Sequence, residues 1–233
     1  MNHKIASGII FAVAALIPLH EASATQIETA PATTYTVTLK KLELCASGSA
    51  IDSEGSTAPT CVSPLVLGTG STAFDIAGVS AGAQLGNFAR ITDWPVGVTY
   101  THLRMTLSRT FSIAGTLSSS GCRTDSTQIS GGTSSTTYGT HDSGTGTAQT
   151  LSIVDNDTYG MGFPSDSEYW SNGLQLNGSD FYYTIELTEP FTSTATVPNV
   201  LISFNTQHGL SGYYGGEVCS LYPNYPSISV SFQ

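Results

Sequence analysis

The chain has 233 residues, of which 10% are charged and 39% are hydrophobic, and its formal net charge is −10. Seven Lys and Arg stand against 17 Asp and Glu. Such a surface repels phosphate, so we expect the chain to bind neither nucleic acid nor anionic membranes. The hydrophobic fraction is sufficient for a buried core, which excludes a wholly disordered chain.

Residues 1–24 have the pattern of a secretory signal peptide. Lys4 precedes an apolar run at 9–16, and Ala22-Ser23-Ala24 fits a cleavage site. The apolar run is too short to span a bilayer, and no later stretch is long enough. The sequence therefore predicts an exported chain without an integral membrane segment. We expect it in the periplasm, on the cell surface or outside the cell.

Four cysteines follow the predicted signal peptide: Cys45, Cys61, Cys122 and Cys219. An even number of cysteines in an exported chain favours disulfides, and close C-x-x-C pairs, which zinc sites use, are absent. Four cysteines allow three pairings. We favour Cys45–Cys61, because this bridge would close the polar segment 46–60, and Cys122–Cys219 as the second disulfide.

Strand patterns dominate the rest of the chain. Alternation of apolar and polar residues predicts strands at 34–44, 73–79, 98–107, 110–117, 149–154, 181–188, 199–205 and 227–232. The alternation slips at Lys40-Lys41, which predicts a β-bulge. No stretch after the signal peptide keeps the 3.6-residue period of a helix.

These patterns predict an all-β fold, an antiparallel β-sandwich of about seven to nine strands with long Gly/Ser/Thr-rich loops. We expect a single domain over residues 25–233, with a long loop or hairpin at about 118–147. The apolar members of the alternating sets should be buried: Tyr35, Val37, Leu39, Phe74, Ile76, Leu103, Met105, Leu107, Ile185, Leu187, Ile202, Phe204, Val230 and Phe232.

A series of short motifs runs through the first half of the chain and returns near its end. The residues that carry it are Phe74-Asp75-Ile76, Pro95, Gly97, Tyr100, Arg104 and Phe204. With this series the chain resembles a family of exported bacterial domains of unknown function with a carbohydrate-binding-like, prealbumin-type β-sandwich. The match covers most of 34–117 and 196–210, but Asn205 stands where the family tends to have Asp. The resemblance implies the fold and no activity, because the family has no assigned reaction.

The chemistry of Arg104 predicts a structural role. It lies among apolar residues of a predicted strand, where an arginine needs a carboxylate partner. We expect Asp75 to be that partner.

Residues suited to catalysis are few. Three histidines follow the signal peptide. His102 lies in a predicted strand without a nucleophile-elbow pattern, His141 in a flexible Gly/Ser/Thr-rich stretch, and His208 in a turn. Acidic residues that could pair for sugar cleavage lie in the second half of the chain: Asp155, Asp157, Asp166, Glu168, Asp180, Glu186 and Glu189. Whether Asp155 and Asp157 bind calcium stays open, although a polar turn is the favoured interpretation. We predict no catalytic residue, no metal and no cofactor, and hence a protein that is not an enzyme.

Aromatic residues give the better lead for binding. Tyr169, Trp170, Tyr213 and Tyr214 lie in segments rich in Gly, Asn and Ser, where we predict loops. Exposed rings on loops stack on sugar faces or anchor a protein partner. The alternative is that these rings fold back onto the edge of the sandwich.

Three functions are compatible with these observations. The leading hypothesis is a non-catalytic, exported structural or interaction protein that binds a protein partner or associates with itself. One version is a filament or pilin-like subunit whose N-terminal segment, 25–38, adds to the sheet of a neighbouring subunit. A carbohydrate-binding module that binds glycan through its loop aromatics is the alternative, and a secreted hydrolase is less favoured.

Overall fold

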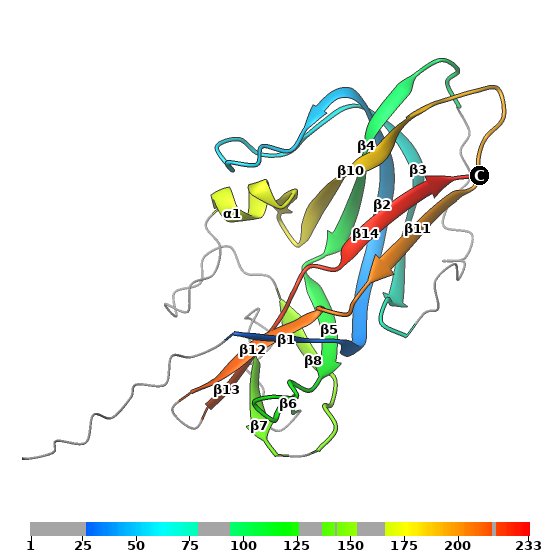
Figure 1. Ribbon diagram of the computed structural model, residues 1–233. Helices are drawn as coiled ribbons and strands as arrows, with labels where there is room; N and C mark the ends of the chain where they lie inside the picture. The colour runs from blue at the N-terminus through cyan, green and yellow to red at the C-terminus, as the bar shows by residue number, and fades with distance from the viewer. Residues whose placement is uncertain (1–26, 79–93, 126–136, 143, 153–165, 216–217) are drawn as a thin grey trace, which may run out of the picture.

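The computed structural model describes residues 27–78, 94–125, 137–142, 144–152, 166–215 and 218–233 (Figure 1). It is almost entirely β. The elements are β1 (Glu28–Ala30), β2 (Ala32–Ala50), β3 (Thr60–Asp75), β4 (Thr99–Ser108), β5 (Thr110–Gly115), β6 (Cys122–Thr124), β7 (Thr137–His141), β8 (Gln149–Ser152), α1 (Asp166–Ser171), β9 (Leu174–Asn177), β10 (Asp180–Thr192), β11 (Val200–Asn205), β12 (Leu210–Gly215), β13 (Val218–Pro223) and β14 (Ser227–Phe232).

A seven-stranded antiparallel sheet forms one wall of the molecule. The long strand β2 pairs with β3 on one side, and with β4 and β5 on the other. Beyond these, β10 pairs with β4, β8 pairs with β5, and β9 pairs with the first four residues of β10. The register of β2 against β3 and β4 shifts between Leu39 and Lys41. This shift confirms the bulge predicted from the slip in alternation.

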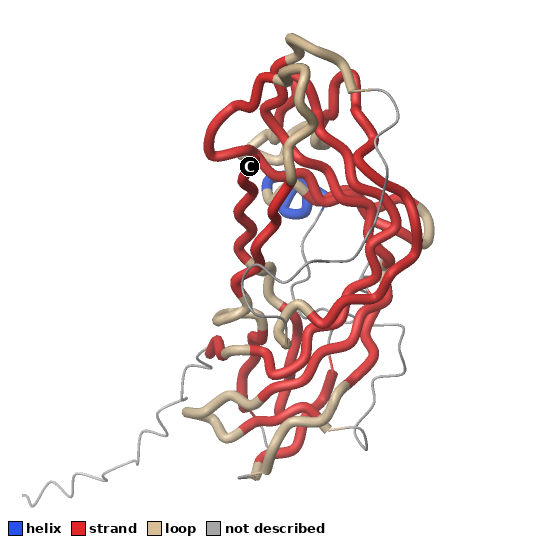
Figure 2. Tube along the Cα trace, turned by 90° about the vertical axis from the view of Figure 1, so that its right-hand side faces the viewer, coloured by secondary structure: helices blue, strands red, loops and turns tan. Residues whose placement is uncertain are grey.

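The last four strands make a long antiparallel ribbon, which we call the C-terminal ribbon. Its pairs are β11 with β14 and β12 with β13. A bond from the Asn224 N–H to the Gly209 carbonyl, 2.9 Å long, connects the strands where the two pairs meet. Figure 2 shows the ribbon opposite the seven-stranded sheet, so the two form the layers of a sandwich.

The two halves of the C-terminal ribbon differ in what lies beside them. Next to β12 lies β1, and next to β13 lies β7, followed by β6, so this half belongs to a five-stranded sheet. The other half, β11 and β14, forms a two-stranded sheet whose strands pair only with each other within the described part of the chain. The ribbon therefore passes from a paired half into a half with two open edges.

Buried side chains form two clusters between the layers. The first packs the five-stranded sheet against β5 and β8, with Ile113, Leu151 and Leu221 at its centre. The second packs the two-stranded sheet against β4, β9 and β10, with Leu103 and Leu174 fully buried. Val37, Phe74 and Phe204 pack against both clusters, so the core is continuous.

The predicted all-β antiparallel sandwich is confirmed. Of the side chains predicted to be buried, seven are buried and seven are half-buried, and none is exposed. The described residues contain fourteen strands, more than the seven to nine expected. Part of the difference lies at 118–147, predicted as a loop or hairpin excursion, where β6 and β7 join the five-stranded sheet. No helix in the described ranges is long and apolar enough to cross a bilayer.

Candidate functional site

The open edge of β14 is the most distinctive surface of the molecule. Asn199 and Gln233 exchange two backbone bonds of 2.7 and 2.9 Å across the ribbon. Bonded and non-bonded pairs alternate along an antiparallel ladder, so the intervening pairs face away from the partner strand. From the register, these pairs are Val200–Phe232, Ile202–Val230 and Phe204–Ile228.

The outward-facing groups of β14 are therefore the N–H and C=O of Ile228, Val230 and Phe232. No residue of the described chain hydrogen-bonds to them, because β14 pairs only with β11. The side chains of the same three residues point inward and pack on the second core cluster. Ser227, Ser229 and Ser231 cover the solvent face of the strand and are exposed. The sequence predicts this alternation, but it contains no signal that the edge lacks a neighbour.

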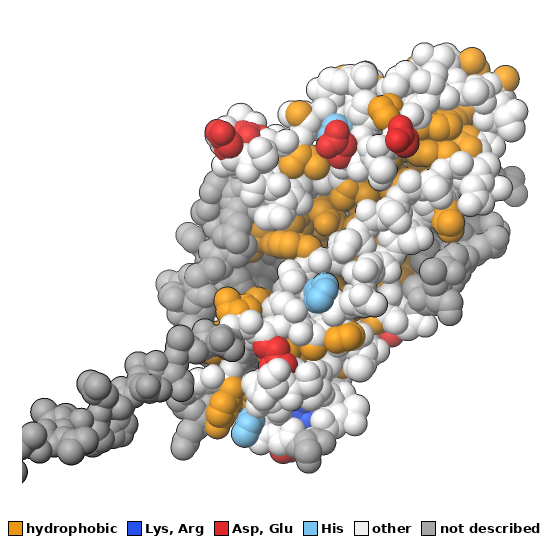
Figure 3. Space-filling view, viewed as in Figure 1, with side chains coloured by type: hydrophobic (Ala, Val, Ile, Leu, Met, Phe, Trp, Pro, Cys, Tyr) orange, Lys and Arg blue, Asp and Glu red, His pale blue; other side chains and the backbone are white. Residues whose placement is uncertain are grey.

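A hydrophobic seam runs beside this edge. β14 lies against β10, and Figure 3 shows hydrophobic side chains at the surface between these two strands. On the inner face of β9 and β10, Leu176, Tyr183 and Ile185 are only half-buried although they belong to the core. Within the described ranges, β11 and β14 cover only part of the inner face of the seven-stranded sheet, and its β10 side carries these half-buried residues.

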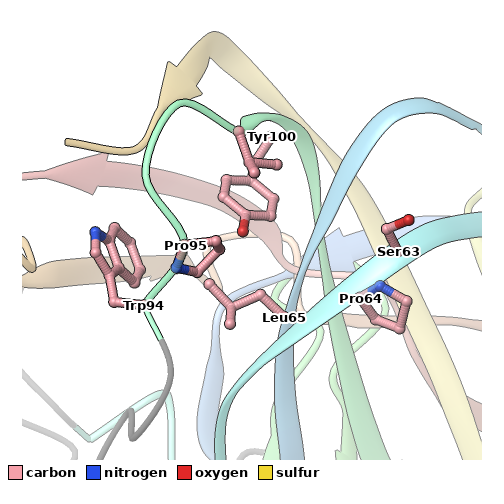
Figure 4. A pocket seen from close by; sticks show the side chains of 7 residues that line it. Ser63, Pro64, Leu65, Trp94, Pro95 and Tyr100 are labelled. Atoms are coloured by element: carbon pink, nitrogen blue, oxygen red, sulfur yellow. The ribbon is translucent and has the colours of Figure 1, made fainter. Parts of the chain in front are cut away.

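A shallow pocket of about 480 Å³ lies elsewhere on the same half of the sandwich (Figure 4). Its lining consists of Ser63, Pro64, Leu65, Trp94, Pro95, Val98 and Tyr100. Tyr100 is 1% exposed, and burial raises the pKa of its phenol. The Trp94 indole donates to the Thr194 carbonyl at 2.7 Å, so its nitrogen is already occupied. The pocket offers aromatic and apolar surface with few polar groups.

The aromatic residues predicted as loop contacts do not lie in loops. Tyr213 and Tyr214 are on β12, and Tyr169 and Trp170 are on the short helix α1. Tyr169 is 6% exposed and belongs to the second core cluster, against which Trp170 packs half-buried. The placement in loops is therefore wrong for all four rings. Tyr213 and Tyr214 lie in the ladder of β12 with β13, and α1 packs its two rings on the second core cluster. Their role in binding stays a prediction.

The Tyr214 ring is the exposed one of these four. It stacks on the imidazole of His141, with ring centroids 4.2 Å apart and planes 14° from parallel. His141 ends β7 and so lies on the five-stranded sheet rather than in a flexible stretch. Beside it, Arg123 donates to both carboxylate oxygens of Asp142 at 2.5 and 2.9 Å. These bonds hold the pKa of Asp142 down at about 2.

The other histidines lie apart from His141. His102 is buried on β4, where desolvation lowers the pKa of its imidazole despite the opposing effect of Glu186. His208 lies in the turn before β12, with its Nδ1 3.2 Å from the Thr29 hydroxyl. The structure therefore does not bring the three histidines together.

The carboxylates are also dispersed. Asp180 pairs with Lys40, whereas Glu186 and Glu189 are exposed on β10. Asp166 and Glu168 belong to α1, and Asp155 and Asp157 lie outside the described residues. Within the described residues, no three His, Cys, Asp or Glu side chains are grouped as a metal site.

Both predicted disulfides are present. Cys45 is bonded to Cys61, with Cα atoms 5.0 Å apart, and Cys122 is bonded to Cys219, with Cα atoms 5.6 Å apart. The first bridge was expected to close a loop between strand ends. Instead, both cysteines lie within strands, and the bridge links β2 to β3 across their hairpin. The second ties β6 to β13 within the five-stranded sheet.

The prediction that Arg104 pairs with Asp75 is wrong. Arg104 lies opposite Glu43 in the register of β2 and β4, and its Nε donates to a Glu43 carboxylate oxygen at 2.9 Å. Asp75 pairs instead with Thr36, near the other end of β2, and accepts the Tyr35 N–H at 2.8 Å. Either Glu43 or Asp75 could have been the partner from the sequence alone, and the strand register places Glu43 opposite Arg104. Glu43, 2% exposed, was not recognised as a buried acid.

No protein-family model matches the chain, and no curated protein or solved structure matches it either. The resemblance to the exported family with a prealbumin-type sandwich therefore stays an expectation.

Proposed function

We propose that this chain is an exported, non-catalytic structural protein that binds a protein partner by accepting a β-strand at the open edge of β14. The observation that carries the proposal is the contrast within the C-terminal ribbon. β12 and β13 have neighbours on both sides, whereas β11 and β14 pair only with each other among the described residues. Strand addition supplies main-chain hydrogen bonds and places alternate side chains of the added strand in the hydrophobic seam.

Two disulfides support the exported part of the proposal. They are stable in oxidising compartments and rare in the cytosol. The predicted signal peptide at residues 1–24 agrees with this location.

Self-association as a filament is one form of the same proposal. In the version expected from the sequence, residues 25–38 of one copy pair with another copy. Within the chain, Glu28–Ala30 pairs with β12, and residues from Ala32 onward pair with β5 and β3. A donor made of these residues would have to leave its own sheets, so a separate protein is the favoured partner.

A proline substitution tests the proposal. Val230→Pro removes an outward N–H that the internal ladder does not use, and it should abolish partner binding without unfolding the chain. Ile202→Pro makes the same change on the β11 edge and serves as the matched control. Both variants are compared with the unmodified chain by co-purification from the native source and by light scattering. Retention of the partner or of oligomers by Val230→Pro would exclude the β14 edge.

Carbohydrate binding is the second candidate, favoured by the pocket at Trp94 and Tyr100. Tyr100 and Trp94 both line this pocket, and aromatic rings are common in sugar sites. Binding to a glycan array that is lost in Trp94→Ala would support this function. Trp170→Ala tests the ring predicted from the sequence.

A further inference from the structure

The sequence contains two Asn-Gly pairs, Asn172-Gly173 just before β9 and Asn177-Gly178 at its end. Asparagine before glycine is prone to lose its side-chain amide in water, because glycine lets its nitrogen approach the preceding side chain. The reaction needs a main-chain nitrogen that is open to water and free to move. The two pairs differ in this respect.

The first pair is fixed by its main-chain contacts. The Gly173 N–H donates to the Trp170 carbonyl at 2.9 Å, and the Gly173 carbonyl accepts from the Thr184 N–H at 2.8 Å. Gly173 is buried, and a Cβ placed on it would lie 2.0 Å from the Thr184 carbonyl oxygen. The main chain therefore cannot turn toward the Asn172 side chain without breaking these hydrogen bonds.

The second pair lies in an exposed turn. Asn177 and Asp180 close the β9–β10 hairpin, and Gly178 and Ser179 form its two-residue loop. Gly178 has a φ of 61°, which fits the first central position of a type II′ turn. Its carbonyl accepts from the Arg109 guanidinium at 2.9 Å, but no described residue accepts its N–H. The nitrogen of this pair is therefore open to water.

The side chain of Asn177 is exposed as well. Its amide donates to the Tyr182 hydroxyl at 2.7 Å, at the surface of the protein. Water can replace an exposed hydrogen bond at little cost, so this bond does not fix the side chain. A Cβ placed on Gly178 would meet no atom within 4 Å. The turn therefore has room for a ring to form between the side chain and the main chain.

We infer that Asn177 is a site of spontaneous deamidation and that Asn172 is protected. The Gly178 nitrogen loses its proton and attacks the Asn177 Cγ. The bond from Cγ to Nδ2 then breaks, and the amide takes up a proton and leaves as ammonia. Water opens the resulting succinimide ring at either of its two carbonyls, which leaves aspartate or isoaspartate. The reaction needs only water, and it is independent of the proposed function.

Deamidation changes the edge of the seven-stranded sheet. Both products add a negative charge opposite Asp180, which pairs with Lys40. Isoaspartate also inserts one carbon into the main chain at the pair that closes the hairpin. β9 is four residues long and pairs only with β10 within the described ranges, so it should lose its register. Leu176, half-buried against the second core cluster, would be released with it.

Incubation of the purified mature chain at mildly alkaline pH tests the inference, and peptide mapping by mass spectrometry measures the conversion. Asn177 should convert at least tenfold faster than Asn172 in the folded chain. In urea with the disulfides reduced, the two rates should become similar, because the fold is what separates the two pairs. Asn177→Gln should stop conversion at this position, since glutamine closes a ring far more slowly, and should leave Asn172 unchanged.

Three outcomes would overturn the inference. The first is conversion of Asn172 at the same rate as Asn177, or faster, in the folded chain. The second is conversion of both residues only after unfolding, which would show that the turn protects Asn177 too. The third is a tenfold difference that persists in urea, which would assign the contrast to neighbouring side chains instead of the fold.

Amide exchange tests the effect on β9. The bond from the Thr184 N–H to the Gly173 carbonyl sets the alternation of the ladder, so the Gln175 N–H also bonds to β10. This amide should exchange at least tenfold faster in the isoaspartate form than in the fresh chain. Asn177→Asp, which has the charge but an unchanged main chain, should keep the slow rate. Equal exchange in the isoaspartate form and the fresh chain would overturn the loosening of β9.

Discussion

The rings of Phe191 and Phe232 stack in parallel, with centroids 4.0 Å apart and planes 12° from parallel. Phe191 lies near the end of β10 and Phe232 ends β14. Trp94 extends the group, with its ring centroid 6.0 Å from that of Phe191. This contact fastens the end of the two-stranded sheet to the seven-stranded sheet, so the β14 edge is held in place without a paired neighbour.

Removal of the Phe232 ring should loosen this end of the sandwich. We expect Phe232→Ala to lower the free energy of unfolding by about 2 kcal/mol, below the full core value because the side chain is half-buried. Urea unfolding measures the change. Ser231→Ala, on the exposed face of the same strand, should change stability by less than about 0.5 kcal/mol. Equal effects of the two substitutions would show that the stacked rings do not anchor β14.

The buried acid Glu43 should depend on Arg104. Glu43 also lies 3.2 Å from the Lys41 ammonium, but Lys41 is the more exposed of its two partners. Arg104→Met should cost about 3 kcal/mol of stability, because it leaves a buried carboxylate with one exposed partner.

The double variant Glu43→Met with Arg104→Met isolates the cause. It removes both charges, so it should recover most of the loss when unfolding is followed in denaturant. A double variant no more stable than Arg104→Met would show that packing, rather than the unpaired charge, controls stability here.

The two disulfides should differ in their contribution to stability. Cys122 and Cys219 are 97 residues apart, whereas Cys45 and Cys61 are 16 apart. Since the longer loop restricts the unfolded chain more, the double Ser variant of Cys122–Cys219 should lose about 4 to 5 kcal/mol, and that of Cys45–Cys61 about 3 kcal/mol. Thermal and urea unfolding of the two variants give the order. The reverse order would place the main contribution in the β2–β3 hairpin.

Acidification should destabilise the chain through His102. Its pKa is lowered in the folded state, mainly because burial disfavours the charged imidazole. The unfolded chain then binds more protons than the folded chain once the pH falls below the ordinary histidine pKa of about 6.5. The contribution of His102 is complete above this pH and is lost as the pH falls through it toward the folded pKa.

Substitution isolates the histidine that is responsible. His102→Gln should flatten the dependence of the unfolding free energy on pH between about pH 7 and pH 5. His208→Gln, at an exposed turn, removes an imidazole of the same kind and serves as the matched control. An unchanged slope in His102→Gln would show that another group titrates in this range.

The sequence predicted the strands in which apolar and polar side chains alternate. It missed strands in glycine-rich segments, such as β7 and β12. A Cβ at Gly139 on β7 would lie 2.2 Å from the Arg123 carbonyl oxygen, and one at Gly212 on β12 would lie 2.3 Å from that of Ser220. Glycine was interpreted as a sign of loops at both places. In the structure it permits close approach of neighbouring strands, which a local pattern cannot distinguish from a turn.

The sequence by itself determined the all-β antiparallel class, the formation of disulfides by its four cysteines and the inward faces of β2, β4, β10 and β14. These follow from local alternation and from cysteine chemistry, which the order of residues contains. Only the tertiary structure decided which cysteines are bonded, that Arg104 pairs with Glu43, and that β14 has no neighbour but β11 among the described residues. Register and strand neighbours depend on backbone hydrogen bonds between distant segments, and every residue except proline offers the same donor and acceptor to those bonds.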